Sequence, residues 1–178
     1  MRNKIVIALC ICVPLLIVFV LLPMGCIFGW GKYLHDPPRP EITYGEFPFR
    51  IEYELQGERF VVEDTVICEF DGFGIGGIGS PKYCKWKSRL ASGGKGNLLI
   101  LGILDNTKRI SLNVGVPEYY MGQMGISSDE YWHYNLKAFL REYTGSFDFV
   151  LFPEEWYDEY GFSFISWEFT DPIVNTFK

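Results

Sequence analysis

Histidine is scarce in this 178-residue chain, which contains two histidines and five cysteines. A zinc site usually draws on several histidine and cysteine ligands, and two histidines are too few for the common arrangements, so we expect no metal site. Basic residues are also in the minority, 16 against 22 acidic residues. Because nucleic-acid binding depends mainly on neutralising phosphates, this balance argues against a nucleic-acid partner.

Motifs that would mark a cofactor or a nucleophile are missing or incomplete. No serine is framed as Gly-x-Ser-x-Gly. Residues 72–77 match the glycine fingerprint of dinucleotide-binding proteins, but that mechanism needs a helix to begin at the last glycines. Here Ile78-Gly79-Ser80-Pro81 follows instead. We therefore expect a glycine-rich loop between strands, and no cofactor.

Charge is absent from one long segment. Between Lys4 and Lys32 lie 27 residues without a charged side chain, most of them large and apolar. A helix needs roughly 20 such residues to cross a bilayer, and one this apolar all round would meet water on one side in so small a protein. The sequence predicts a transmembrane helix over residues 5–28, within an anchor or signal segment spanning residues 1–31.

Three fates of this segment stay open. Arg2 and Lys4 make a basic start, so a cleaved secretory signal is one of them, although no small-x-small cleavage triplet follows. Gly25 before Cys26 fits a lipoprotein signal with lipidation at Cys26, but Pro23 stands where leucine is usual. Retention as a single-pass anchor is the expectation that we favour. All three fates place the C-terminal domain outside the cytoplasm, and it stays bound to the cell membrane if the segment is retained or lipidated.

A proline-rich stalk over residues 32–41 separates this segment from the rest, because the run from Asp36 to Pro40 favours an extended polyproline conformation. The remainder, residues 42–178, has the apolar and aromatic content of one globular domain. Outside the cytoplasm, a disulfide between Cys68 and Cys84 would persist. We expect these two cysteines to lie on adjacent strands and to face inward, with two buried free thiols as the alternative.

Alternating apolar and polar residues predict strands through most of the domain. Hairpins are expected from residues 49–55 with 60–70, and from residues 98–104 with 110–116. Residues 98–104 are almost wholly apolar, which predicts a central strand covered on both faces. A third strand over residues 84–90 carries Lys85, Lys87 and Arg89 on one face, and we expect these to pair with the acidic faces of its neighbours.

Helices are expected only in the C-terminal half. Ser127 and Glu130 form a capping box, and the spacing from Trp132 to Tyr143 predicts a helix over residues 127–143. Pro153 opens a second short helical stretch, and strands are expected over residues 147–151 and 162–169. The predicted class is α+β, a mostly antiparallel sheet of about six or seven strands with one or two helices.

Several strings carry a resemblance to a known group of proteins. They are Gly25-Cys26, Pro37-Pro38-Arg39-Pro40, Tyr44 to Arg50, Lys85-Trp86-Lys87-Ser88, Glu118 to Gly122 and Ile165-Ser166-Trp167-Glu168. With the apolar head, they resemble a family of small, membrane-anchored, uncharacterised bacterial proteins over nearly the whole chain. The resemblance implies an exported protein and assigns no catalytic residue.

These observations favour a non-enzymatic interaction module outside the cytoplasm. Its partners would be the lipid bilayer, through residues 5–28, and a protein or cell-envelope ligand that the sequence does not identify. Tyr119, Tyr120 and Met121, in an irregular stretch, are the candidate ligand platform, with burial in the core as the alternative. The alternative function is a cell-envelope hydrolase, with Glu118, Glu168 or Asp171 as its nominal carboxylates.

Overall fold

The computed structural model describes residues 35–76, 80–93, 96–104, 108–142, 148–151 and 158–178. The predicted anchor over residues 5–28, the alternative of lipidation at Cys26 and most of the predicted helical stretch from Pro153 lie outside them. The chain divides into two compact units, one of Met1–Arg39 with Gly72–Lys85 and one of Pro40–Asp71 with Trp86–Lys178. The larger unit carries most of the fold, and residues 72–85 of the predicted domain cluster with the stalk.

The first predicted hairpin is confirmed. Strand β1 (Tyr44–Leu55) pairs antiparallel with β2 (Glu58–Ile75), with Ile51 opposite Val62. The turn between them places Gln56 and Gly57 at φ values of 54° and 82°. Two successive positive φ values are the geometry of the two-residue hairpin turn whose twist matches that of the strands.

A four-stranded sheet grows from this hairpin, in the order β3-β2-β1-β8. Strand β3 (Lys82–Leu90) is the third predicted strand, and β8 (Phe162–Phe169) pairs antiparallel with β1. The Lys87 ammonium lies 2.5 Å from an Asp71 carboxylate oxygen. This ion pair is of the cross-strand kind that we expected for the basic face of β3.

The second predicted hairpin is also confirmed, but it begins a separate sheet. This sheet has the order β4-β5-β6-β7, formed by Leu98–Leu104, Lys108–Asn113, Ala138–Glu142 and Asp148–Leu151. The prediction that β4 is covered on both faces is wrong. It is the first strand of the sheet order and buries one side, Leu99, Leu101 and Leu104, while Ile100 and Ile103 are 50% and 62% exposed.

The predicted helix over residues 127–143 is correct only in its first half. Helix α4 (Ser128–Asn135) begins as expected, because the Ser127 hydroxyl accepts a hydrogen bond from the Glu130 amide. It ends where the Asn135 side chain donates to the Tyr131 carbonyl, 2.8 Å away. Residues 138–142 then form β6, because β5 needs a partner on the side away from β4, and Leu140 lies opposite Ile110.

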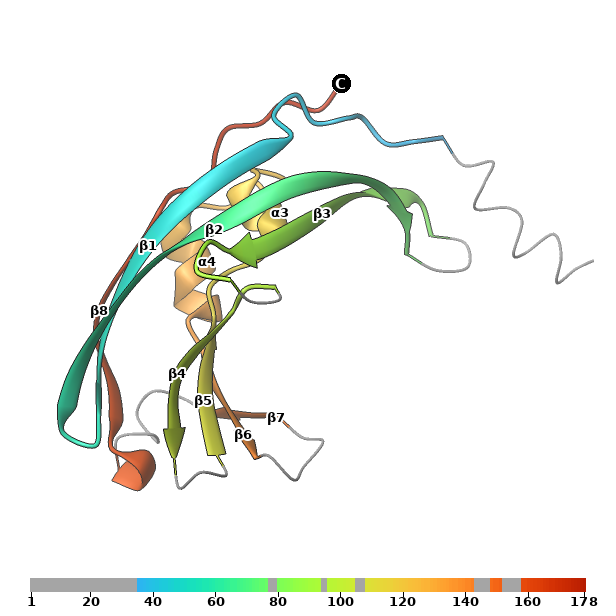
Figure 1. Ribbon diagram of the computed structural model, residues 1–178. Coiled ribbons are helices and arrows are strands. Elements are labelled where there is room, and N and C mark those ends of the chain that lie inside the picture. The colour runs from blue at the N-terminus through green and yellow to red at the C-terminus, as the bar shows by residue number, and fades with distance from the viewer. Residues whose placement is uncertain (1–34, 77–79, 94–95, 105–107, 143–147, 152–157) are drawn as a thin grey trace, which may run out of the picture. The chain divides into compact units, whose positions relative to one another are not determined.

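The core of the larger unit lies between its two sheets and its helices (Figure 1). The short helix α3 (Pro117–Tyr120) places Tyr120 against Phe47 of β1, with ring centroids 4.7 Å apart. The Tyr53 hydroxyl of β1 donates to the Leu101 carbonyl of β4 over 2.5 Å. The described chain is mostly antiparallel sheet with a few short helices, which fits the α+β or the mainly β class.

Candidate functional site

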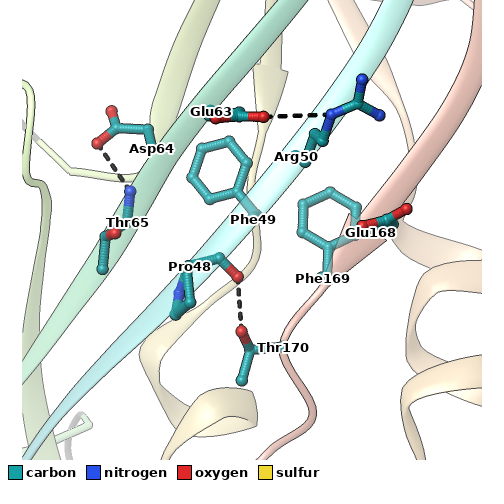
Figure 2. A pocket seen from close by; sticks show the side chains of 9 residues that line it. All are labelled: Pro48, Phe49, Arg50, Glu63, Asp64, Thr65, Glu168, Phe169 and Thr170. Atoms are coloured by element: carbon teal, nitrogen blue, oxygen red, sulfur yellow. Dashed lines mark hydrogen bonds and ion pairs between the residues drawn. The ribbon is translucent and has the colours of Figure 1, made fainter.

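A pocket of about 540 Å³ lies where β2, β1 and β8 run side by side (Figure 2). Nine residues line it: Pro48, Phe49 and Arg50 of β1, Glu63, Asp64 and Thr65 of β2, and Glu168, Phe169 and Thr170 at the end of β8. Successive residues of a strand point to opposite faces, so the pairing register sorts these side chains. Pro48, Arg50, Glu63, Thr65 and Glu168 share the face that we call the outer face.

Three charged side chains form a row across the outer face. Arg50 lies opposite Glu63 on β2 and opposite Glu168 on β8. Its guanidinium Nε is 3.3 Å from a Glu63 oxygen, and the Arg50 and Glu63 side chains are 37% and 70% exposed. Because neighbouring strands lie about 4.8 Å apart, the β2 and β8 backbones here are separated by about 10 Å, with β1 between them. The row presents negative, positive and negative charge to solvent.

Aromatic and hydroxyl groups complete the lining. The rings of Phe49 and Phe169 lie in the middle of the view in Figure 2, with centroids 5.8 Å apart and planes tilted by 31°. Phe169 also stacks on Trp132 of α4 at 3.7 Å, which fixes the end of β8. The Thr170 hydroxyl donates to the Pro48 carbonyl over 2.6 Å. These contacts hold the rim of the pocket in one arrangement.

Asp64 has a structural role. Its carboxylate accepts hydrogen bonds from its neighbour Thr65, from the Ser92 amide at 3.1 Å and from the Ser92 hydroxyl. Asp64 therefore fixes the turn that follows β3. We do not count it among the groups that are available to a ligand.

Beside the charged row, a further carboxylate is buried. Glu52 is 7% exposed, and it accepts a hydrogen bond from the Arg59 guanidinium and a weak one from the Ser166 hydroxyl at 3.4 Å. Arg50 lies 3.6 Å from its second oxygen. The hydrogen bond from Arg59 is the main reason that the pKa of Glu52 lies below its usual value. Arg50 thus connects the pocket to a fixed network of charges.

The structure places the candidate ligand platform in the core. Tyr119, Tyr120 and Met121 are 1%, 0% and 0% exposed. Tyr119 stacks on Tyr131 with centroids 3.9 Å apart, and the Tyr120 hydroxyl donates to the Val114 carbonyl over 2.6 Å. All three side chains are packed in the core, so they form no platform on the surface of the described structure.

The three nominal hydrolase carboxylates lie in different places. Glu168 lines the pocket, Glu118 lies on α3, and Asp171 follows β8. Arg50 and Glu63 were expected only as members of the wet face of a hairpin. No single sequence motif predicts the pocket, because its residues come from three strands, one of which is distant in sequence from the other two. Strand order and register were needed to bring them together.

Cys68 and Cys84 are both buried and are free thiols in the structure. They lie on β2 and β3, which are neighbours in the sheet order, as expected. Burial, with a smaller contribution from the charge of Glu118, raises the pKa of Cys68 to about 12, and burial raises that of Cys84. The two cysteines belong to different compact units, and their disulfide stays a prediction.

Among the described residues, no group of three histidine, cysteine or acidic side chains is arranged to hold a metal ion. The same part of the chain contains no helix that is long and apolar enough to span a membrane. Comparison of the chain with protein-family models, with curated proteins and with solved structures finds no match.

Proposed function

We propose that this chain is a membrane-anchored binding module that works outside the cytoplasm without catalysing a reaction. Residues 5–28 would hold it in the bilayer as a single-pass helix, because they are long and apolar enough and carry no charge. The stalk over residues 32–41 would separate the folded part from the membrane. Lipidation at Cys26 would serve the same purpose if the segment is processed.

The observation that carries the binding role is the charged row at the pocket. Arg50 lies between Glu63 and Glu168 in the pairing register of three strands, and the row is open to solvent. A ligand with cationic groups on either side of an acceptor would complement it, for example an extended peptide segment with basic and acidic side chains.

The same row argues against the hydrolase. A pair of catalytic carboxylates must flank one bond of the substrate, with open space between them. Here Glu63 and Glu168 lie on strands that are separated by β1, and the Arg50 guanidinium forms an ion pair with Glu63. Glu118 and Asp171 are outside the lining of the pocket. The arrangement recognises charge rather than delivering an acid and a base to one substrate bond.

Affinity capture from cross-linked membranes tests this proposal. The natural chain is compared with Glu168→Gln, which removes the charge on β8, and with Glu58→Gln, which removes an exposed charge at the far end of the same sheet. Loss of one exposed ion pair costs about 1 kcal/mol, so recovery of the true partner should fall about fivefold with Glu168→Gln alone.

Equal recovery of every captured protein by all three chains would contradict a binding role for the pocket. Hydrolytic turnover of an envelope polymer that is lost with Glu168→Gln, in a protein that remains folded, would favour the hydrolase instead. Circular dichroism of each variant provides the folding control.

A further inference from the structure

Residues 72–76 and 80–85, the ends of β2 and β3, form a hairpin arm that belongs to the same compact unit as the stalk. We infer that this arm is a second membrane contact, in which Ile75 and Tyr83 enter the headgroup layer next to the anchor. The inference rests on the proposed anchoring and adds to it, because it assigns a partner to a part of the folded chain.

Two contacts show in which direction the stalk runs along the arm. The Cys84 thiol donates to the Pro38 carbonyl over 3.5 Å, and the Lys82 ammonium lies 2.8 Å from an Asp36 carboxylate oxygen. Going back two residues along the stalk therefore moves two residues along β3 toward the tip of the arm. Asp36 thus lies at the Lys82 end of the described part of β3.

The remaining connection is short. Eight Cα-to-Cα steps, with seven residues between, separate Asp36 from Phe28, the last residue of the predicted membrane helix. Fully extended, they span at most about 29 Å. The headgroup layer adds about 5 to 8 Å on each side of the hydrocarbon core. Asp36, and the part of β3 that contacts it, therefore stay within about 29 Å of the hydrocarbon core whenever the anchor is inserted.

The exposed side chains of the arm suit that surface. Ile75 and Tyr83 are 49% and 44% exposed, although both are large and apolar or aromatic. Residues 72–85 contain two lysines and no acidic residue, in a chain whose net charge is −6. Tyrosine is enriched at membrane interfaces, and the Lys82 ammonium is already paired with Asp36. The rest of the acidic domain would be repelled by anionic lipid.

Gly74 holds the tyrosine in its position. A Cβ atom on Gly74 would lie only 2.5 Å from the Tyr83 Cζ atom, so the ring lies directly over the glycine backbone. One face of the ring is covered in this way while the side chain stays substantially exposed. Any larger residue at position 74 would displace the ring from the arm.

Photocrosslinking of the full chain in vesicles tests the inference. Benzoylphenylalanine replaces Ile75 in one variant and Val61 in a second, because Val61 is equally exposed, at 50%, but lies outside the arm. Each variant is reconstituted in phosphatidylcholine vesicles that contain about 30% phosphatidylglycerol, which gives the vesicles an anionic surface. The expected result is covalent lipid adducts at position 75, at least about fivefold above position 61.

Equal or absent lipid adducts at the two positions, in chains that float with the vesicles, would overturn the arm contact and leave the anchor intact. Crosslinks from position 75 to protein instead of lipid would overturn it in favour of a protein partner. Failure of the chains to float would overturn both the anchoring and the arm contact. If the probe at position 75 disturbs the hairpin, a third variant with the probe in place of Tyr83 repeats the test.

Discussion

At the scale of single residues, the structure uses charge in two ways. Glu63 and Glu168 are exposed beside Arg50, where a ligand can reach them. Glu52 is on the same face of β1 but is buried, and two arginines surround it. A buried carboxylate without such partners would be costly, so the arginines are needed to keep it charged. Glu52 therefore links the stability of the sheet to pH.

The first prediction concerns this link. The pKa of Glu52 is lowered in the folded chain, chiefly by its hydrogen bond with Arg59, so its contribution to stability is complete above the unfolded-state pKa, about 4.3. It is lost as the pH falls through the lower, folded-state value. Urea unfolding should show that the free energy of unfolding declines between pH 7 and pH 3, and that it declines less in Glu52→Gln than in the natural chain. An unchanged decline in that variant, with Glu58→Gln as the control, would contradict the assignment.

The second prediction concerns the two buried thiols. With the pKa of Cys68 at about 12, only about one thiol in 10,000 is ionised at pH 8, and the thiolate is the reactive form. Iodoacetamide should therefore modify Cys68 and Cys84 slowly in the folded protein. When exported protein is then unfolded without a reductant, iodoacetamide reports the redox state of the two cysteines. Free thiols are modified at once, whereas a disulfide prevents modification. Rapid modification of the folded protein would refute the burial of these thiols.

At the scale of elements, close approach of the backbone explains one junction. Gly122 follows α3 with φ at 72°, and a Cβ atom there would lie 2.2 Å from the Ile173 carbonyl oxygen. The Ile173 amide donates to the Tyr120 carbonyl over 2.9 Å, so the C-terminal segment is fixed against α3 at this point. A glycine is required here by both conformation and space.

The third prediction follows from that junction. Gly122→Ala combines a strained φ with a clash against backbone and should lower the free energy of unfolding by at least about 3 kcal/mol. Gly57→Ala has a similar φ of 82° but no atom within 4 Å, and it should cost only about 1 kcal/mol. Chemical denaturation of the two variants measures the difference. Similar losses in both would show that the C-terminal segment does not pack on Gly122.

The fourth prediction tests the placement of β4 at the edge of its sheet. Ile103 is 62% exposed, so Ile103→Lys should change the free energy of unfolding by no more than about 0.5 kcal/mol. Leu104 is 4% exposed on the opposite face, and Leu104→Ala should cost about 2 to 5 kcal/mol. A large loss of stability with Ile103→Lys would instead support the prediction from the apolar sequence, a central strand covered on both faces.

Both hairpins were predictable because alternation and turn residues are local signals. The run from Leu98 to Leu104 misled because an apolar sequence does not reveal whether a neighbouring strand covers it. Residues 138–142 were assigned to a helix because Phe139 and Leu140 fit both helical and strand spacing, and only the need of β5 for a partner decides between them. The pocket was not predictable, since it depends on the register of Arg50 with β2 and β8.

Across the full chain, a predicted anchor precedes the folded part that the structure describes. Composition indicated one domain after the stalk, and this stays a prediction; in the structure the hairpin arm clusters with Met1–Arg39, and the rest of the two sheets belongs to the other unit. This division gives the arm and the pocket separate roles in the proposal. The arm would meet lipid, and the pocket would meet a ligand in the space beyond the membrane.

The fifth prediction addresses the central claim, that the folded part lies outside the cytoplasm on a membrane anchor. The full chain with a C-terminal epitope is expressed in bacterial cells, and intact spheroplasts are treated with an external protease. In untreated cells, the epitope should stay with the membranes after alkaline extraction. In protease-treated spheroplasts, the epitope should be removed while a cytoplasmic marker protein survives. An epitope that is extracted by alkali, or that is digested only after detergent is added, would contradict the claim.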